Sequence, residues 1–178
     1  MKKSVLSIGQ IPGFSILLTA IIFVSSLLGL VPSALAAHTS VSPIIASLFS
    51  FSGNRPTNLG IKQGKFAPCP TSPNCVSSQS LDTQHQIEPF NYQDTPKKAF
   101  ENLKIILANT ENAEIITAEA NYIYAEFTSD LMGFVDDVEF YLDEKDSLIQ
   151  VRSASRLGES DLGANRKRIE AIRARFQL

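Results

Sequence analysis

The sequence predicts an α+β domain: an antiparallel sheet of about five strands, including two hairpins, covered on one face by two helices. Three observations support this fold class. Two segments carry apolar residues at helical spacing, the segments between them alternate with a period of two, and short polar turns separate the alternating segments. Hairpins lying between two helices favour an antiparallel sheet with its helices on a single face.

The first predicted elements are a strand and a helix. Residues 85–92 form a short strand candidate. Residues 94–109 predict a helix, because Asp94 or Thr95 can cap its first turn and Pro96 fits the first helical position. The apolar face of this helix comprises Phe100, Leu103, Ile106 and Leu107.

Two hairpins follow this helix. Residues 113–120 and 122–129 are rich in β-forming residues and meet at a short polar connection. Residues 136–142 and 147–156 alternate between apolar and polar residues on either side of a charged turn. The sequence therefore predicts four consecutive antiparallel strands.

The alternation also predicts a register for the second hairpin. A turn centred on Glu144 and Lys145 sets Asp137 opposite Arg152 on the polar face, as a cross-strand ion pair. The neighbouring Asp136 then falls on the apolar side of the sheet.

The last predicted helix starts at a cap, Ser160 or Asp161, and runs to about Phe176. Asn165 falls on its apolar stripe, where a buried amide costs free energy unless it is hydrogen-bonded. The stripe itself comprises Leu162, Ile169, Ile172 and Phe176.

Asp136 and Asn165 predict one polar cluster where the last helix meets the sheet. One interpretation is a pocket for a small ligand or anion. The other is a structural network that locks the helix onto the hairpin, and satisfied buried networks are the more common of the two. The cluster comprises Asp136, Ser153, Ser155 and Asn165, with Arg156 and Arg166 as further candidates.

The N-terminal segment has the pattern of a secretory signal peptide, residues 1–36. Lys2 and Lys3 precede an apolar run over 14–31, and an A-x-A processing site ends at Ala36. An uncleaved membrane anchor is the alternative, since the apolar run just reaches spanning length. Residues 37–65 then form a linker or extended arm, and residues 66–178 form a single domain.

Charge is segregated along the domain. Residues 81–146 hold fifteen acidic residues against four lysines, whereas residues 151–178 carry a net charge of +4. The simplest explanation is that the two parts neutralise each other across the fold. Nucleic acid is not an expected partner, because no basic stripe with interleaved aromatic residues is present.

Cys69 and Cys75 are the only cysteines of the chain. In an exported protein they predict a disulfide, which would stabilise the fold by about 2 kcal/mol by restricting the unfolded chain. A nucleophilic Cys75 with His85 as its base is an alternative. With His38 as the one other histidine, no tetrahedral metal site can be completed, and no cofactor is predicted.

Two function classes remain from the residues alone. The first is a non-catalytic binding or accessory module. The second is a hydrolase- or lyase-type enzyme in which Asp136 acts as general acid or base and Arg152, Arg156 or Arg166 holds an anionic substrate. The sequence contains no G-x-S-x-G elbow that would indicate a serine nucleophile.

Three segments, "CPTSPNCVSSQS", "GFVDDVEFYL" and "VRSASRLGESDLGANRKRIEAIR", closely resemble the domain of unknown function 1499 family over about residues 66–178. The resemblance implies an exported or membrane-attached protein of proteobacteria or oxygenic phototrophs, and it assigns no activity. It marks the positions of the shared motifs, which are Cys69, Cys75, Asp136, Asp137, Glu139, Arg152, Ser153, Ser155, Arg156, Asp161, Asn165, Arg166 and Arg168.

We therefore expect an exported, disulfide-stapled binding module of the periplasm or the thylakoid lumen. Its expected partner is a small anion, a lipid headgroup or a protein, and membrane contact is expected only through an uncleaved N-terminal segment. The candidate binding residues are Asp136, Arg152, Ser153, Ser155, Arg156, Asn165, Arg166 and Arg168.

Overall fold

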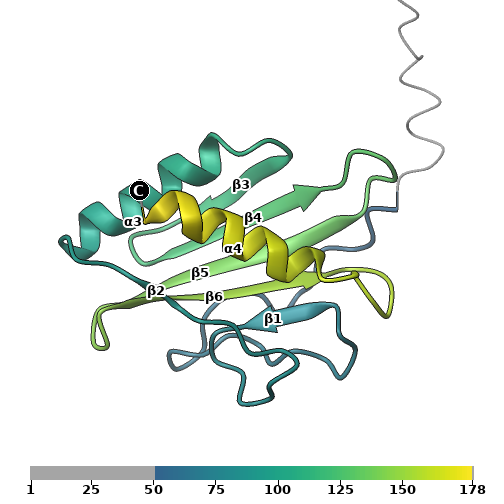
Figure 1. Ribbon diagram of the computed structural model, residues 1–178, viewed down its shortest axis with the longest axis horizontal. Coiled ribbons are helices and arrows are strands. Elements are labelled where there is room, and N and C mark those ends of the chain that lie inside the picture. Colours follow the sequence, from purple (N-terminus) through teal and green to yellow (C-terminus); the bar gives the residue numbers. More distant parts are fainter. Residues whose placement is uncertain (1–50, 178) are drawn as a thin grey trace, which may run out of the picture. The chain divides into compact units, whose positions relative to one another are not determined.

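The computed structural model describes residues 51–177 (Figure 1). The predicted signal peptide and the first part of the predicted linker lie outside the described residues. No helix between Phe51 and Gln177 is both long and apolar enough to cross a bilayer.

The described chain forms one antiparallel sheet and two helices, which confirms the predicted α+β class. Five strands follow the order β1-β6-β5-β4-β3, and β2 pairs with β6 alongside β1. The strands are β1 (Cys75–Ser77), β2 (Phe90–Asn91), β3 (Ala113–Ala118), β4 (Tyr122–Thr128), β5 (Val135–Asp143) and β6 (Leu148–Ser155).

Helix α3 (Pro96–Ala108) begins as its sequence predicts. Thr95 is the N-cap, its hydroxyl accepts from the N–H of Lys98 at 3.4 Å, and Pro96 occupies the first helical position. Its apolar face is buried at Leu103 and Leu107, so the helical spacing fixes which side meets the sheet.

Helix α4 (Ala164–Phe176) starts later than predicted. Gly163 precedes its first turn with φ of 80°, and no side chain caps that position. Asp161 instead accepts from the N–H of Asn165 at 2.8 Å. Leu162, predicted to belong to the apolar stripe, lies in the turn with φ of 52° and is 88% exposed. That part of the stripe prediction is wrong.

The second hairpin differs from its predicted register by two residues. Glu139 lies opposite Arg152, and Asp137 lies opposite Ala154. The predicted pairing of Asp137 with Arg152 is therefore wrong. A shift of two keeps every side chain on its predicted face, so the hydrophobic pattern cannot choose between these registers. The register is instead set by the turn between the two strands, in which Ser147 has φ of 55°.

Strand β1 is an element that the sequence pattern does not predict. Its Ser77 pairs with Arg152 on β6. Just beyond the strand, the Ser78 hydroxyl accepts from the N–H of Val151 at 2.8 Å. This side-chain contact extends the pairing along the sheet edge.

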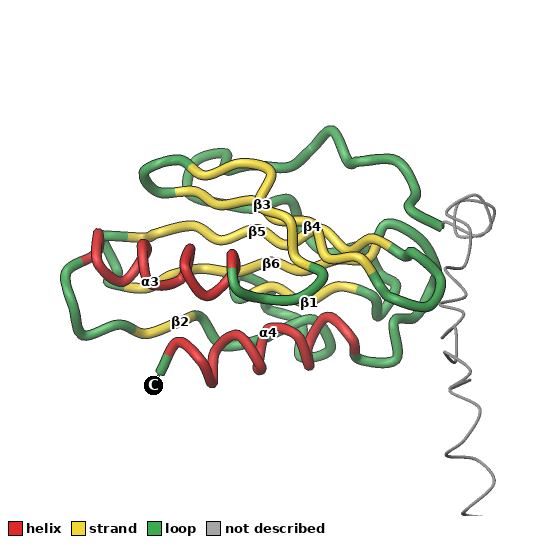
Figure 2. The backbone as a smooth tube through the Cα atoms, turned by 90° about the horizontal axis from the view of Figure 1, so that it is seen from above, coloured by secondary structure: helices red, strands yellow, loops and turns green. Residues whose placement is uncertain are grey.

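Both helices cover the same face of the sheet (Figures 1 and 2). The core lies between the helices and the sheet. It includes Val138, Phe140 and Val151 from the central strands and Ile169 and Ile172 from α4. The opposite face is crossed by residues 51–65, which we call the arm (Figure 2). Arg55 reaches Glu126 of β4 at 2.6 Å, and the N–H of Gly60 donates to Glu139 of β5 at 2.7 Å.

Candidate functional site

Two polar clusters occupy opposite faces of the sheet. The helix-side cluster lies beneath α4 and comprises Asp136, Ser153, Ser155, Asn165 and Arg168. The arm-side cluster comprises Tyr122, Tyr124, Glu126, Asp137, Glu139, Arg152 and Arg156.

The centre of the helix-side cluster is Asn165, whose side chain is fully buried. Its Oδ1 accepts from the Ser153 hydroxyl at 2.5 Å, and its Nδ2 donates to Ser155 Oγ at 2.9 Å. Nδ2 also lies 3.1 Å from the carbonyl oxygen of Asn74 and 2.9 Å from Asp161 Oδ2. The amide on the apolar stripe therefore has partners on both its oxygen and its nitrogen, which removes the cost of burying it.

The arginine of the helix-side cluster is Arg168. It donates to Asn165 Oδ1 at 2.9 Å and to Ser153 Oγ at 3.3 Å, and it pairs with Asp136. Its guanidinium also lies 4.9 Å from the centre of the Phe127 ring, a cation–π contact. The Arg168 and Asp136 side chains are 18% and 11% exposed, so this ion pair lies at the edge of the cluster rather than sealed inside it.

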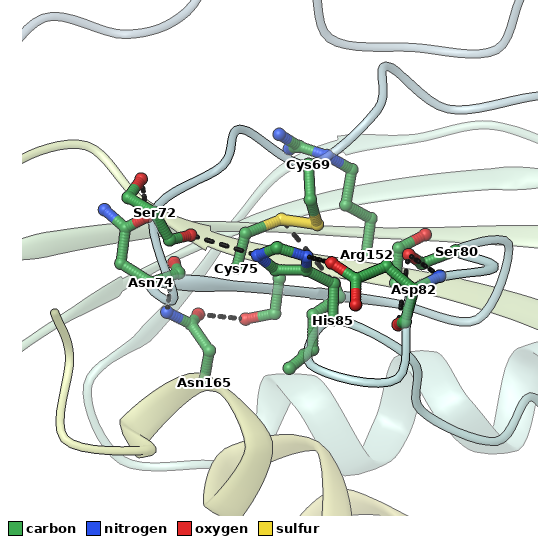
Figure 3. The surroundings of a disulfide bond; sticks show 12 residues. Cys69, Ser72, Asn74, Cys75, Ser80, Asp82, His85, Arg152 and Asn165 are labelled. Carbon is green, nitrogen blue, oxygen red and sulfur yellow. Dashed lines mark hydrogen bonds and ion pairs between the residues drawn. A yellow bond between two sulfur atoms is a disulfide. The ribbon is translucent and has the colours of Figure 1, made fainter. Parts of the chain in front are cut away.

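The disulfide loop meets the helix-side cluster. Cys69 and Cys75 are joined in a disulfide, which confirms the predicted pairing. Asn74 bridges the two segments, since its carbonyl accepts from Asn165 and its Nδ2 donates to the carbonyl of Gly158 at 2.6 Å. Figure 3 shows Asn165 reaching from α4 toward Asn74, next to the disulfide. The Cys69–Cys75 disulfide therefore holds the loop whose Asn74 carbonyl completes the hydrogen bonds of Asn165.

The disulfide leaves no free thiol in the chain, so it does not support the nucleophilic Cys75 interpretation. The buried His85 ring instead lies between Asp82 and the carbonyl of Ser72, with ring nitrogens 2.7 and 3.1 Å from those two acceptors (Figure 3). Backbone and His85 hydrogen bonds lower the pKa of Asp82. Across residues 51–177, no group of three or more metal-ligating side chains is present.

Three of the candidate arginines do not join Asp136. Arg152 lies in the arm-side cluster and donates to Glu139 at 3.3 Å. Arg156 also lies there and contacts Asp137 at 2.8 Å. Arg166 is on an exposed part of α4 and donates to the carbonyl of Gln84 at 3.1 Å. The structure therefore does not assemble the proposed set of Asp136 with a substrate-binding Arg152, Arg156 or Arg166.

The arm-side cluster is a network of charged groups. Tyr124 donates to Asp137 at 2.6 Å, and Arg156 contacts both Asp137 and Glu126. Burial alone would raise the pKa of Glu126, but hydrogen bonds from Arg55, Tyr124 and Arg156 outweigh it and lower the pKa to about 2. Burial, with the adjacent carboxylates, also raises the pKa of Tyr124 and of Tyr122. Both phenols therefore stay neutral hydrogen-bond donors.

A pocket of about 200 Å³ opens beside the helix-side cluster, at the end of the sheet where α4 begins. Asp136, Ser155 and Arg168 supply polar groups to its wall, and Phe134 and Leu157 supply apolar surface. Ser129, Ser160 and Asp161 add further hydrogen-bonding groups. Of the predicted candidate residues, Asp136, Ser155 and Arg168 line this pocket.

Sequence patterns could have placed two of these arginines correctly. On a strand, Arg156 has the same parity as Arg152 and the opposite parity to Ser153 and Ser155, so it belongs on the arm side. On a helix, Arg168 lies three residues after Asn165 and therefore on the same side of α4. No comparable local pattern indicates that Arg55, in the arm, would reach Glu126.

Comparison with known proteins gives one match. The family model described as "Protein of unknown function (DUF1499)" matches residues 65–176. None of the curated proteins and none of the solved structures matches the chain.

Proposed function

The chain belongs to the DUF1499 family, and from this premise we propose that it is an exported, disulfide-stapled binding module. Its ligand is a small polar group, uncharged or zwitterionic, which binds in the pocket beside Asp136 and Arg168. The ligand is either a free solute or the headgroup of a lipid, since both can present the same hydroxyl or zwitterionic chemistry.

The observation that carries this proposal is the mixed lining of the pocket. Polar groups of the helix-side cluster and the apolar side chains of Phe134 and Leu157 line the same pocket. Small-molecule sites typically combine apolar surface with a few fixed polar groups. The polar groups here are held by the network around Asn165, so they are positioned before a ligand arrives.

The charges of the pocket favour a neutral or zwitterionic ligand over the free anion that the sequence left open. The charged residues lining it are Asp136, Asp161 and Arg168. Arg168 is already paired with Asp136, and Asp161 accepts from the backbone at the start of α4. An added anion would therefore approach two carboxylates and compete with Asp136 for the one arginine.

The size of the pocket limits the ligand further. At about 200 Å³ it is smaller than the roughly 300–1,000 Å³ of sites that enclose drug-sized molecules. A headgroup-sized ligand fits this volume, with any larger apolar part outside. The exposed side chain of Leu157 at the pocket mouth would accept such an apolar part.

Export is supported by the disulfide and by the predicted signal peptide. Disulfides persist in oxidising compartments and are rare in the cytosol of mesophiles. We propose the periplasm or the thylakoid lumen, with membrane attachment through residues 14–31 as the alternative.

The test measures ligand-induced thermal stabilisation of the full chain with three probes: galactose, phosphocholine and inorganic phosphate. We expect galactose or phosphocholine to raise the melting temperature, because a ligand that binds only the folded state stabilises it. Inorganic phosphate should not raise the melting temperature. Native mass spectrometry of the chain purified from its host then distinguishes a retained lipid from a free solute by mass.

A matched pair of variants on α4 locates the effect. Ala164 lines the pocket and is exposed, and Ala174 is exposed on the same helix away from that lining. Ala164→Leu should abolish the stabilisation by filling the pocket, and Ala174→Leu should retain it. A stabilisation that survives Ala164→Leu, or that only phosphate produces, would overturn the proposal.

A further inference from the structure

We propose that one end of the domain is a docking surface for a lipid bilayer. The surface, which we call the apolar end, comprises Phe51, Leu131, Met132, Phe134, Leu157 and Leu162. Two of these residues, Phe134 and Leu157, also line the pocket, but the inference does not depend on the ligand proposed above. It also goes beyond the expectation that only the N-terminal segment meets a membrane.

The apolar end collects most of the large apolar side chains that the described part of the chain leaves exposed. Eight such residues are exposed between Phe51 and Gln177, and six of them belong to this end. Leu131 is 91% exposed and Leu162 is 88% exposed. Single exposed apolar residues need no explanation, but a contiguous group of them marks an interaction surface.

These residues come from three separate segments that meet at one end of the sheet. The segments are the start of the arm, the β4–β5 loop and the β6–α4 loop, which Figure 1 shows together at the end where α4 begins. The rings of Phe51 and Phe134 stack with their centres 5.4 Å apart, and the N–H of Phe51 donates to the carbonyl of Met132 at 3.1 Å.

Gly53 allows the β6–α4 loop to lie close to the start of the arm. A Cβ atom at this position would lie 3.0 Å from Cβ of Arg156 and 3.1 Å from Cγ of Leu157, and the backbone there has φ of 63°. Glycine therefore allows the arm to pack directly against the β6–α4 loop. The apolar end is therefore a defined surface, because close contacts of the backbone hold the start of the arm against both loops.

The course of the chain identifies a bilayer as the occupant. The described chain begins at Phe51, which is itself part of the apolar end. In the sequence, the segment Ile44–Phe51 is largely apolar, and the apolar run 14–31 lies further upstream. The domain is therefore connected to the most lipid-compatible part of its chain at the end that exposes its own apolar side chains. A retained upstream segment would raise the local concentration of this surface at the membrane.

The charges around the apolar end define the kind of lipid contact. Asp130 and Glu159 are exposed in the two loops, and Arg168 is paired with Asp136. Anionic lipids would be repelled rather than attracted by these acids. We therefore expect contact through apolar side chains with neutral lipid, with little dependence on salt. The contact is shallow, because irregular loops cannot enter the hydrocarbon core with unpaired backbone groups.

Because the chain contains no tryptophan, a single introduced tryptophan can report lipid contact by its fluorescence. A single Leu131→Trp substitution places one fluorophore on the apolar end, and Leu81→Trp places one at a 99% exposed position outside it. The full-length variants are mixed with, or reconstituted into, phosphatidylcholine vesicles whose acyl chains are brominated. We expect quenching of the Leu131→Trp emission and none for Leu81→Trp. Equal emission of the two variants with and without brominated lipid would overturn the proposal.

A second quencher separates the bilayer from other occupants. Without vesicles, aqueous acrylamide should quench Leu131→Trp as strongly as Leu81→Trp, and vesicles should protect only the former. Protection of Leu131→Trp in the absence of lipid would mean that a second copy or the chain's own Ile44–Phe51 segment covers this end, and would overturn the proposal.

Two further variants test the ligand pocket and the apolar end independently. Adding Met132→Glu to a Leu162→Trp reporter should reduce lipid quenching severalfold, because it places a charge on the docking surface. The same Met132→Glu change should leave the galactose or phosphocholine stabilisation intact, since Met132 does not line the pocket. Conversely, Ala164→Leu should leave quenching of Leu131→Trp unchanged. Lipid quenching that is insensitive to Met132→Glu would count against the apolar end.

Discussion

The helix-side and arm-side clusters use the same strands, but they satisfy their buried polar groups in different ways. Beneath α4, the neutral amide of Asn165 meets donors and acceptors from three segments of the chain: β6, the residue before β1 and the turn before α4. Beneath the arm, charges are neutralised in pairs, as in Arg152 with Glu139 and Arg156 with Asp137. One buried atom there, Nε of Arg152, has no hydrogen-bond partner within residues 51–177.

The helix-side cluster therefore fixes how α4 packs on the sheet, whereas the arm-side cluster depends on the arm that covers it. The partners of Asn165 lie on β6, directly before β1 and in the turn before α4, so the cluster locks those elements together. The arm-side cluster receives two of its contacts, from Arg55 and Gly60, from a segment without long strands or helices of its own. We therefore expect the arm-side pairs to be the more sensitive to removing one charge, and the helix-side cluster to be the more sensitive to changing shape.

The largest effect is expected from Glu139→Ala. Glu139 is fully buried, and its loss leaves the buried guanidinium of Arg152 without its carboxylate. Breaking a buried pair in this way costs about 3–5 kcal/mol. Urea unfolding of the variant measures the loss. The double variant Glu139→Leu with Arg152→Met should recover much of it, because no charge is then left unpaired. A double variant as unstable as Glu139→Ala would mean that the pair acts through more than charge.

Asn165→Ala should follow, with a loss of about 3 kcal/mol. It removes a fully buried amide and leaves Ser153, Ser155 and the carbonyl of Asn74 with lost partners, each unsatisfied group costing roughly 1–3 kcal/mol before relaxation. Asn102→Ala, at an exposed position of α3, is the matched control and should change stability by less than about 0.5 kcal/mol. Similar values for the two variants, measured by thermal or urea unfolding, would contradict the locking role.

Acid should weaken the arm-side cluster through Glu126. Its pKa is about 2 in the folded protein against an ordinary value of 4.5, so its contribution is complete above pH 4.5 and is lost as the pH falls toward 2. The contribution is at most about 3.5 kcal/mol, since one pKa unit corresponds to about 1.4 kcal/mol. Urea midpoints from pH 6 to pH 2 measure it. Glu126→Gln should flatten this slope, and an unchanged slope would assign the acid sensitivity to other carboxylates.

Arg55→Ala should have the smallest effect on stability, because the Arg55 side chain is 52% exposed and exposed ion pairs contribute little. The informative measurement is local. Without this contact, hydrogen exchange should accelerate over residues 51–60 and stay unchanged in β5 and β6. Acceleration throughout the sheet would mean that the arm is an integral part of the core.

Particular residues show how far the sequence alone reaches. A cap at Asp94 or Thr95, the hairpin strands and the burial of Asn165 follow from local spacing. The structure confirms them, with Thr95 as the cap. The pairing of Arg168 with Asp136 was not predicted, although the spacing from Asn165 carried the signal. The pocket beside this pair depends on loops from distant parts of the chain, which no local pattern records.

Within the helices and the hairpin strands, the sequence by itself determined which residues face the core, because helical and strand periodicities are properties of consecutive residues. It also determined the disulfide partners, since only two cysteines exist. The tertiary structure alone decided the partners across segments: Glu139 for Arg152, Asn74 for Asn165 and the arm for Glu126. Registers that differ by two residues bury the same side chains, so only the turn and the packing of the whole domain can choose among them.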